Sequence, residues 1–309
     1  MQKQINYYKE KEKMIKIFQD TLKATQKRYL RQTADSIRES ILYQEGDKRY
    51  KHPGDERPYD TMEVHVYKDT TVDTAIRIKK KHFDDKVAIL NFASAKSPGG
   101  KVVDGSIAQE ECICRCSNLY SILTDPKFKK GYYEFHKYNH NKLYTDKLIY
   151  SPDVILFRND AHRYHFNKWN KHKKNGPEYP VDVITCAAPN IRGLGGSVDK
   201  QLVMRNDMNK IYVERIRTIF LSAYTHGVDH LILGAWGCGV FRNDPKEIAK
   251  AFHEVQDEFK GCFKNIVYSI YCDEGERSEN YEAFREEFKL SWMDNKNEEL
   301  LDESEDSDD

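Results

Sequence analysis

The class of fold is indicated most clearly by residues 86–111, KVAILNFASAKSPGGKVVDGSIAQEE. This stretch begins with an apolar run that ends near Phe92 and has no strict alternation, as expected of a strand covered on both faces. A loop containing Gly99 and Gly100 follows, and the pattern predicts that a helix begins at about Gln109. In open α/β sheets ligands bind beyond the carboxyl ends of strands, so this loop is a candidate binding site.

The rest of the chain alternates strand-like and helix-like segments. Short apolar runs rich in β-branched and aromatic residues predict strands at 63–67, 86–92, 154–157, 181–187, 230–236 and 265–271. Apolar residues at helical spacing predict helices at about 72–81, 109–123, 200–226 and 245–260. Alternating strands and helices predict an α/β fold in which helices sandwich a mainly parallel or mixed sheet.

Three regions depart from this alternation. Apolar residues at helical spacing predict one or two amphipathic helices within residues 1–45, laid against the main domain or left as an exposed arm. Residues 125–180 are rich in Lys, His, Asn and Tyr and predict a long surface excursion around one strand. Residues 293–309 predict a disordered acidic tail. We therefore expect a helical extension (1–45), one domain (46–292) and this tail.

Composition and charge argue against several classes of protein. The chain has 309 residues with 50 basic and 50 acidic side chains, whereas a protein that grips nucleic acid non-specifically needs an excess of Lys and Arg. Its N-terminus has no apolar signal region, and no apolar run is long enough to span a bilayer. The seven cysteines are not spaced as a disulfide framework. We expect an intracellular protein, cytoplasmic or nuclear, with free thiols and no membrane partner.

Two adjacent carboxylates, Glu110 and Glu111, stand after the glycine-rich loop in the first turn of the expected helix. Acidic residues there complement the helix dipole, so ordinary first-turn residues are the alternative interpretation. Glycoside cleavage needs a carboxylic acid to protonate the leaving oxygen and a carboxylate to activate water. One residue can do both in succession if a poorly solvated cleft raises its pKa. The pair is therefore a candidate catalytic centre.

The runs LNFASAKSPGG and AQEECICRCSNLY resemble the signature of the poly(ADP-ribose) glycohydrolase family, particularly its microbial-type branch: a glycine triplet, a short spacer, then Gln-Glu-Glu. The resemblance covers most of residues 10–290. It implies a macrodomain-like three-layer α/β/α sandwich with a mixed central sheet. The implied activity is hydrolysis of ribose–ribose O-glycosidic bonds in poly(ADP-ribose), or in ADP-ribosylated protein, with ADP-ribose as product.

The resemblance also assigns roles to the Gln-Glu-Glu motif. It implies that Glu111 is the general acid and then the general base, that Glu110 holds the distal ribose hydroxyls, and that Gln109 supports the start of the helix. No metal or cofactor is needed, nucleic acid is not required, and we expect a monomer.

One position departs from the signature, because the third glycine of the triplet is Lys101 here. If the backbone there needs positive φ or a close approach to the pyrophosphate, lysine strains the loop. If the position only lines the rim, the ammonium group can pair with a phosphate. The departure leaves two alternative functions open: a macrodomain that binds ADP-ribose without cleaving it, and a hydrolase of mono-ADP-ribose linked to protein or nucleic acid.

A second glycine-rich turn follows the strand expected at 230–236. It resembles the second phosphate-binding loop of macrodomains, which here is made of Gly237, Cys238, Gly239, Val240 and Phe241. We expect the diphosphate between this turn and residues 99–101. Phe241 is expected to pack on a ribose or the adenine, or else to close the turn as a core residue. Asn91 and Asn190, each near a strand end, are expected to face the ligand; turn-forming asparagines are the alternative.

Overall fold

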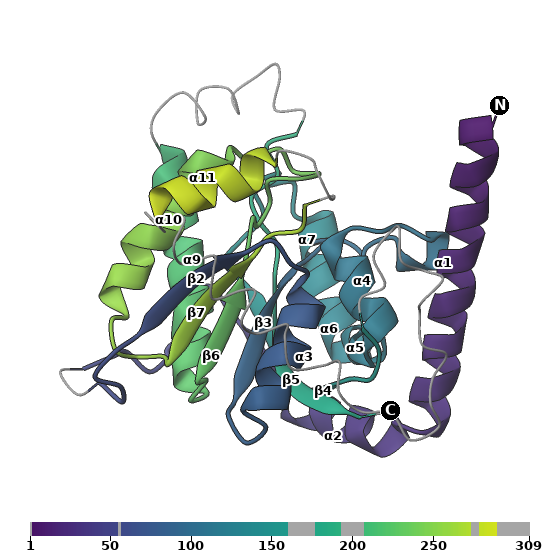
Figure 1. Cartoon of the computed structure of the whole chain (residues 1–309), viewed down its shortest axis with the longest axis horizontal. Coiled ribbons are helices and arrows are strands. Elements are labelled where there is room, and N and C mark those ends of the chain that lie inside the picture. The colour runs from purple at the N-terminus through teal and green to yellow at the C-terminus, as the bar shows by residue number, and fades with distance from the viewer. Residues whose placement is uncertain (1, 55–56, 160–176, 193–206, 273–277, 289–309) are drawn as a thin grey trace, which may run out of the picture.

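The computed structural model describes residues 2–54, 57–159, 177–192, 207–272 and 278–288. Their core is a sheet with the strand order β1-β4-β5-β3-β6-β7-β2 (Figure 1). The strands are Ile41–Tyr43 (β1), Glu63–Tyr67 (β2), Val87–Phe92 (β3), Leu148–Leu156 (β4), Tyr179–Cys186 (β5), His230–Leu233 (β6) and Asn265–Ser269 (β7). β4 pairs antiparallel with β1 and β5, whereas the pairs from β5 to β2 are parallel. The expected mixed sheet is confirmed.

Helices cover both faces of this sheet, with α9, α10 and α11 on one side and α3 to α6 on the other (Figure 1). The residues of β3 explain why, since Ala88 and Leu90 belong to the core on the α9 side while Val87 and Ile89 belong to the core on the α3 side. Such two-sided burial is the period-two pattern of a strand inside a sandwich. The three-layer α/β/α architecture is therefore confirmed.

Helices α3 and α10 begin and end within two residues of the predicted bounds, and no helix was predicted over α11. Their bounds are Gln2–Lys27 (α1), Leu30–Glu39 (α2), Thr71–Lys81 (α3), Gln109–Cys116 (α4), Leu119–Leu123 (α5), Pro126–Phe128 (α6), Phe135–Tyr138 (α7), Asp207–Thr225 (α9), Pro245–Glu258 (α10) and Glu279–Glu287 (α11). None of these described helices combines the length and apolarity needed to cross a membrane. Residues 200–206 of one predicted helix and the acidic tail 293–309 lie outside the described residues.

The N-terminal region contains the expected helices α1 and α2, and also strand β1. The helical pattern was expected to continue through Ile41 and Leu42, which instead pair antiparallel with Tyr150 and Ile149 of β4. The backbone turns extended at Ser40, where ψ is 139°, and the chain then joins the sheet as its edge strand. Ladder hydrogen bonds to β4 override the weak local helical preference, which is the usual fate of a short ambiguous apolar run.

The expectation of a surface excursion at 125–180 was wrong for its first half. Residues 126–138 form α6, a π-helical segment (Lys129–Glu134) and α7, and Phe128, Tyr132 and His136 of these turns are buried. Because these three side chains are four residues apart, they share one helical face that packs into the core. The abundance of Lys, His and Asn concealed this face in the sequence. Strand β4 is also longer than expected, and residues 160–176 lie outside the described residues.

The helix predicted over 109–123 is two helices, interrupted at Ser117 and Asn118. Ser117 forms an isolated antiparallel bridge to Leu156, and the Asn118 side chain accepts a hydrogen bond from Ile155 N–H at 2.9 Å. The chain thus leaves the helix to satisfy backbone groups at the end of β4. This break limits α4 to two turns, so its first turn carries the carboxylates and its last turn meets the sheet.

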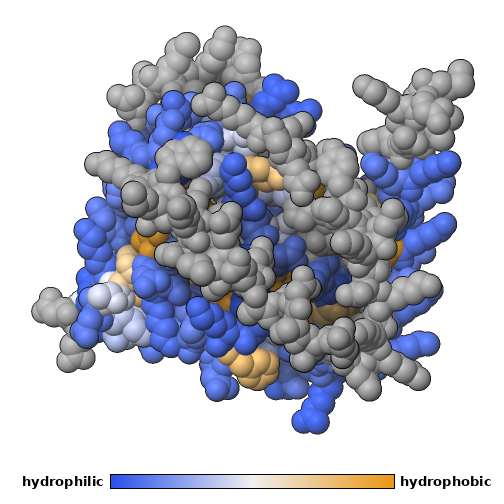
Figure 2. Space-filling model, in the orientation of Figure 1, coloured by the Kyte–Doolittle hydropathy of each residue, from blue (hydrophilic) through white to orange (hydrophobic). Residues whose placement is uncertain are grey.

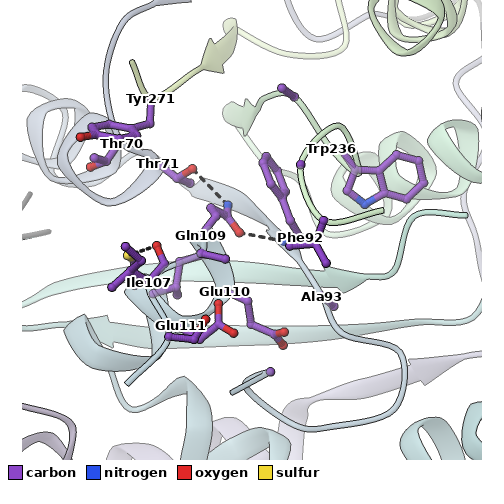
Figure 3. Close-up of a pocket in the computed structure, with 18 of the residues that line it drawn as sticks. Thr70, Thr71, Phe92, Ala93, Ile107, Gln109, Glu110, Glu111, Trp236 and Tyr271 are labelled. Atoms are coloured by element: carbon purple, nitrogen blue, oxygen red, sulfur yellow. Dashed lines mark hydrogen bonds between the residues drawn. The ribbon is translucent and has the colours of Figure 1, made fainter. Parts of the chain in front are cut away.

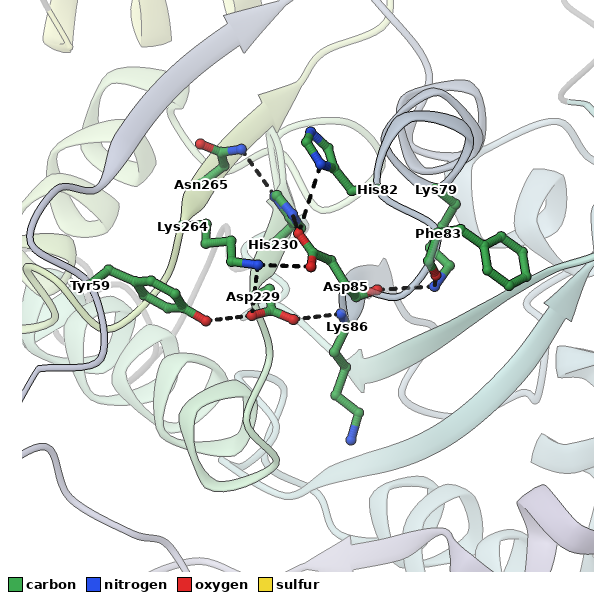
Figure 4. A network of polar contacts seen from close by, with 10 residues as sticks. All are labelled: Tyr59, Lys79, His82, Phe83, Asp85, Lys86, Asp229, His230, Lys264 and Asn265. Atoms are coloured by element: carbon green, nitrogen blue, oxygen red, sulfur yellow. Dashed lines mark hydrogen bonds and ion pairs between the residues drawn. The ribbon is translucent and has the colours of Figure 1, made fainter.

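The amino ends and the carboxyl ends of the parallel strands differ in the side chains they carry. At the amino ends of β3, β6 and β7 a network of polar side chains ties the strands together (Figure 4). Asp229 accepts hydrogen bonds from Tyr59 Oη and Lys86 N–H, and Asp85 pairs with Lys264 at 2.8 Å and His230 at 2.9 Å. A cavity lies at the opposite, carboxyl ends of these strands.

Candidate active site

The cavity lies at the carboxyl ends of β2, β3, β6 and β7 and has a volume of about 750 Å³. It is lined by the residues that end or follow these strands, namely 69–72, 92–94, 235–237 and 269–271, and by the first turns of α4 (Figure 3). Its volume is within the ~300–1,000 Å³ common for small-molecule sites. The location agrees with the rule that ligands bind beyond the carboxyl ends of parallel strands.

The first glycine-rich loop needs glycine at two positions and not at the third. Gly99 and Gly100 have φ of +64° and +59°. A Cβ atom on Gly99 would lie 2.7 Å from the Tyr120 ring, and one on Gly100 would collide with the Glu111 carboxylate. Lys101 has φ −113°, an ordinary value for any residue, and its side chain is exposed at the cavity rim. The lysine therefore does not strain the loop, and the rim alternative is the one that fits.

Gln109 fastens the start of α4 to strand β3. Its side-chain oxygen accepts a hydrogen bond from Phe92 N–H at 2.8 Å, and its amide nitrogen donates to the Leu90 carbonyl at 2.7 Å and to Thr71 Oγ1 at 3.1 Å. Three hydrogen bonds fix both the helix and the orientation of its first turn (Figure 3). The amide supports the helix start, as expected, and it also lines the cavity.

Glu110 is buried at the floor of the cavity, with 3% of its surface exposed. Burial raises the pKa of its carboxyl group well above the usual range, against the opposing effect of the Ser94 N–H donor. That N–H lies 2.7 Å from Oε2, and Asn91 Nδ2 lies 3.4 Å from Oε1. The nearby charge of Glu111 pushes the pKa in the same direction as burial. Burial and the neighbouring carboxylate therefore both favour the protonated form of Glu110.

Glu111 lies beside Glu110 and lines the same end of the cavity, with 6% of its surface exposed (Figure 3). Its Oε1 atom accepts a hydrogen bond from Lys101 N–H at 2.9 Å. Glycine at position 100 leaves the space that this carboxylate occupies. The loop and the carboxylate therefore determine each other's position.

The second glycine-rich turn forms the opposite wall of the cavity through Gly237, Gly239, Val240 and Phe241. Gly237 has φ +77°, and a Cβ atom there would collide with Ala188. Within the described part of the chain, the N–H groups of Gly239, Val240 and Phe241 have no protein acceptor. Consecutive N–H groups of this kind form a concave site for an anion such as a phosphate.

Some predicted ligand-facing residues do not line this cavity. Cys238 faces a neighbouring depression, and Gly99 packs beneath the loop against Tyr120. Asn91 is fully buried between Glu110 and Thr185, where it supports the floor. Asn190 lies outside the cavity, with Nδ2 3.3 Å from Tyr144 Oη. For both asparagines the fold gives a structural role.

Three residues that line the cavity were not predicted from the sequence as site residues: Ser94, Thr71 and Tyr271. Ser94 provides the N–H that holds Glu110, and Thr71 holds Gln109. Tyr271, with 41% of its surface exposed, lines the far end, on the other side of Gln109 from the two carboxyl groups (Figure 3). Thr71 and Tyr271 follow β2 and β7. Applying the strand-end rule to every parallel strand would have predicted them.

These features give the site two chemical functions. One end holds a buried carboxyl group with a raised pKa beside a second carboxyl group, the pair of groups needed for acid–base cleavage of a glycosidic bond. One wall presents N–H donors suited to a phosphate. No group of three or more His, Cys, Asp and Glu side chains placed to hold a metal ion occurs in the described ranges.

Comparisons with known proteins point in the same direction. The family model described as microbial-type PARG, catalytic domain, matches residues 4–159. A poly(ADP-ribose) glycohydrolase from Thermomonospora curvata is 30% identical, with a TM-score of 0.75, and the match covers 90% of this chain and 100% of that one. The same enzyme bound to the inhibitor ADP-HPD matches with a TM-score of 0.71 and 30% identity, covering 89% and 99% of the two chains.

A poly(ADP-ribose) glycohydrolase from Deinococcus radiodurans in complex with ADP-ribose is 34% identical to this chain, with a TM-score of 0.68. That match covers 83% of this chain and 96% of the other. No curated protein sequence matches.

Proposed function

The chain belongs to the microbial-type poly(ADP-ribose) glycohydrolase family, and we propose that Glu111 is the residue with which it hydrolyses ribose–ribose bonds of poly(ADP-ribose). The observation that carries this proposal is the placement of Glu111 at the end of the cavity, beside the buried carboxyl group of Glu110 and under a backbone donor from the glycine-rich loop. The released product is ADP-ribose, the molecule bound by the Deinococcus radiodurans enzyme.

The cavity fits the terminal ADP-ribose unit in one direction. Its diphosphate lies along the second glycine-rich turn, whose unpaired N–H groups at 239–241 provide donors. The distal ribose then reaches Glu110 and Glu111, with Phe241 against the sugar. The half-exposed ring of Tyr271 leaves the adenine an aromatic surface at the other end. This pose places the scissile bond at the carboxyl pair.

In the proposed reaction Glu111 begins as a carboxylic acid and donates its proton to the oxygen that leaves C1 of the distal ribose. The C1–O bond breaks, and the sugar takes on oxocarbenium character. Glu111, now a carboxylate stabilised by Lys101 N–H, takes a proton from a water molecule that attacks C1. Neutral Glu110 binds a ribose hydroxyl without adding a second negative charge. The products are ADP-ribose and a polymer shortened by one unit.

The structure of the loop around Lys101 favours an enzyme over a protein that only binds ADP-ribose. The replaced glycine leaves the loop unstrained, and its N–H still holds the Glu111 carboxylate. A protein that only binds ADP-ribose has no evident need for two buried carboxyl groups, because burying ionisable groups is costly.

The test compares wild type with Glu111→Gln for ADP-ribose release from purified poly(ADP-ribose), with ADP-ribose affinity measured by calorimetry. Removing the acid and base should lower turnover by roughly a thousandfold or more, because general acid–base groups contribute ~10²–10⁴-fold. Affinity should stay within about threefold, since the diphosphate contacts lie elsewhere. Undiminished release by the variant would overturn the role of Glu111.

A further inference from the structure

The loop that connects the glycine pair to α4, residues 102–108, is held against helix α1. Gly105 has φ +75°, and a Cβ atom there would lie 2.6 Å from the Lys11 carbonyl oxygen and 3.2 Å from Ile15 Cγ1. Backbone therefore packs directly on backbone at this point, a contact that only glycine permits. Figure 1 shows α1 running along the side of the molecule next to α4. The connecting loop cannot shift outward without meeting this helix.

The other side of the connecting loop is held by Arg115, in the last turn of α4. Its guanidinium group donates to the Ser106 carbonyl and lies 3.0 Å from Cys112 Sγ. Arg115 is 5% exposed and lines the cavity. A buried cation is costly unless its donors are used, so these contacts fix the side chain strongly.

Helix α1 also holds the backbone of α4 at the same residue. Thr21 Oγ1 donates to the Arg115 carbonyl at 2.6 Å, and Arg158 Nη1 in turn donates to Thr21 Oγ1 at 2.6 Å. The neighbouring face of α1 packs in the core, where the rings of Phe18 and Tyr120 pack edge-to-face with their centroids 4.9 Å apart. Helix α1 is thus a fixed support on which both α4 and the connecting loop rest.

A chain of contacts leads from these supports to the reacting carboxylate. Arg115 holds the Ser106 carbonyl, Ser106 N–H donates to the Lys101 carbonyl at 3.2 Å, and Lys101 N–H donates to Glu111 Oε1 at 2.9 Å. Between the two side chains, the contacts run through the main chain of Ser106 and Lys101. A displacement of residues 102–108 would therefore be felt at Glu111.

We propose that Gly105 and Arg115 are positioning residues for the glycohydrolase reaction, and that α1 is part of the active-site scaffold. They hold the connecting loop so that Lys101 N–H stays aimed at the Glu111 carboxylate, the group that carries negative charge after proton transfer. This inference rests on the proposed role of Glu111. Neither residue is assigned a contact with the ribose or the diphosphate, so losing either should lower kcat more than affinity.

The first test is Gly105→Ala, compared with Gly227→Ala. Gly227 has φ +66°, close to that of Gly105, but no atom lies within 4 Å of a Cβ placed there. It precedes β6, at the amino ends of the parallel strands and away from the cavity. Both substitutions impose the left-handed backbone on alanine, and only the first also collides with α1. We expect kcat to fall roughly tenfold to a hundredfold for Gly105→Ala, the size of effect that a misplacement of ~1 Å produces. The Gly227 variant should keep wild-type kcat.

The second test uses Arg115→Met and Arg115→Lys, which keeps the argument testable if Gly105→Ala does not fold. Methionine removes the donor to Ser106, whereas lysine can supply one donor and should recover part of the lost kcat. ADP-ribose affinity, measured by calorimetry, should change by less than about threefold in all folded variants. A merely structural role would lower the melting temperature with kcat per folded molecule unchanged, and that result would overturn the proposal.

The outcome for Glu111→Gln separates the two proposals. Inactive Glu111→Gln together with normal kcat in the Gly105 and Arg115 variants would contradict the positioning role alone. An active Glu111→Gln would contradict the proposed reaction, and the positioning inference would fail with it.

Discussion

The two adjacent glutamates differ in environment although they share one helical turn. Glu110 is buried among Asn91, Ser94 and the floor of the cavity, and this burial raises the pKa of its carboxyl group. Glu111 faces the glycine-rich loop and receives Lys101 N–H. Placing two carboxyl groups in different surroundings is how one site obtains an acid and a binding group from the same residue type.

This asymmetry predicts different results for the two amide variants. A neutral carboxyl group and an amide have nearly the same shape, and the amide oxygen can still accept the Ser94 N–H. Glu110→Gln should therefore keep at least about tenfold more activity than Glu111→Gln, which loses the transferable proton. Steady-state ADP-ribose release on both variants, with binding measured in parallel, checks this. Equal and complete inactivation would show that Glu110 must ionise during the reaction.

The place of the first turn of α4 at the cavity could be predicted because the chemistry of its residues and their position after a strand coincide in the sequence. Gln109, Glu110 and Glu111 directly follow a glycine-rich loop at a strand end, and all three line the cavity. Asn91 and Asn190 could not be placed, since a side chain at the end of a strand can point to either face. That orientation depends on tertiary contacts, such as those of Asn91 with Thr185.

At the scale of elements, the sequence predicted the strands and helices that have strong periodicity. The six expected strands are all present in the sheet, β2 with the predicted ends and the other five with changed ends. The predictions were wrong where a contact with a distant segment determines the local structure. Strand β1 pairs with β4, the Asn118 side chain accepts a hydrogen bond from Ile155 N–H where the helix breaks, and residues 126–138 bury an aromatic face in the core. Local patterns cannot reveal such partners, because the contacts join residues far apart in the chain.

The polar network at the amino ends of the strands gives a prediction about stability (Figure 4). Asp229→Ala leaves Lys86 N–H and Tyr59 Oη without their acceptor. Unfolding in urea should show a loss of about 0.5–1.5 kcal/mol, the usual net contribution of a hydrogen bond whose groups water can still reach. Asp257→Ala, which breaks an exposed pair with Lys260, should cost less than about 0.5 kcal/mol.

The Asp229 variant also tests the separation of the two sheet edges. Because the cavity lies at the opposite ends of the strands, kcat per folded molecule should equal that of wild type. A large fall in kcat would show that the network acts on the active site as well as on the stability of the sheet.

At the scale of the whole molecule, the stabilising polar network lies at the amino ends of the parallel strands and the cavity lies at their carboxyl ends. The parallel strands bring every loop of the cavity to the carboxyl edge, and the two helical layers hold these loops from both sides. The face shown in Figure 2 is mainly hydrophilic over the described residues, with scattered hydrophobic spots. The exposed large hydrophobic side chains of the described residues include Val240 and Tyr271, which line the cavity.

The most direct test of the account is whether Glu111 supplies the proton to the leaving oxygen. We would measure kcat/KM of wild type and Glu111→Gln on poly(ADP-ribose) and on ADP-ribose carrying 4-nitrophenol at the same anomeric carbon. Nitrophenolate leaves without protonation, so the account predicts a loss of roughly a thousandfold on the polymer and a much smaller loss on the nitrophenyl substrate. An equal loss on both substrates would contradict the role of Glu111 as the general acid.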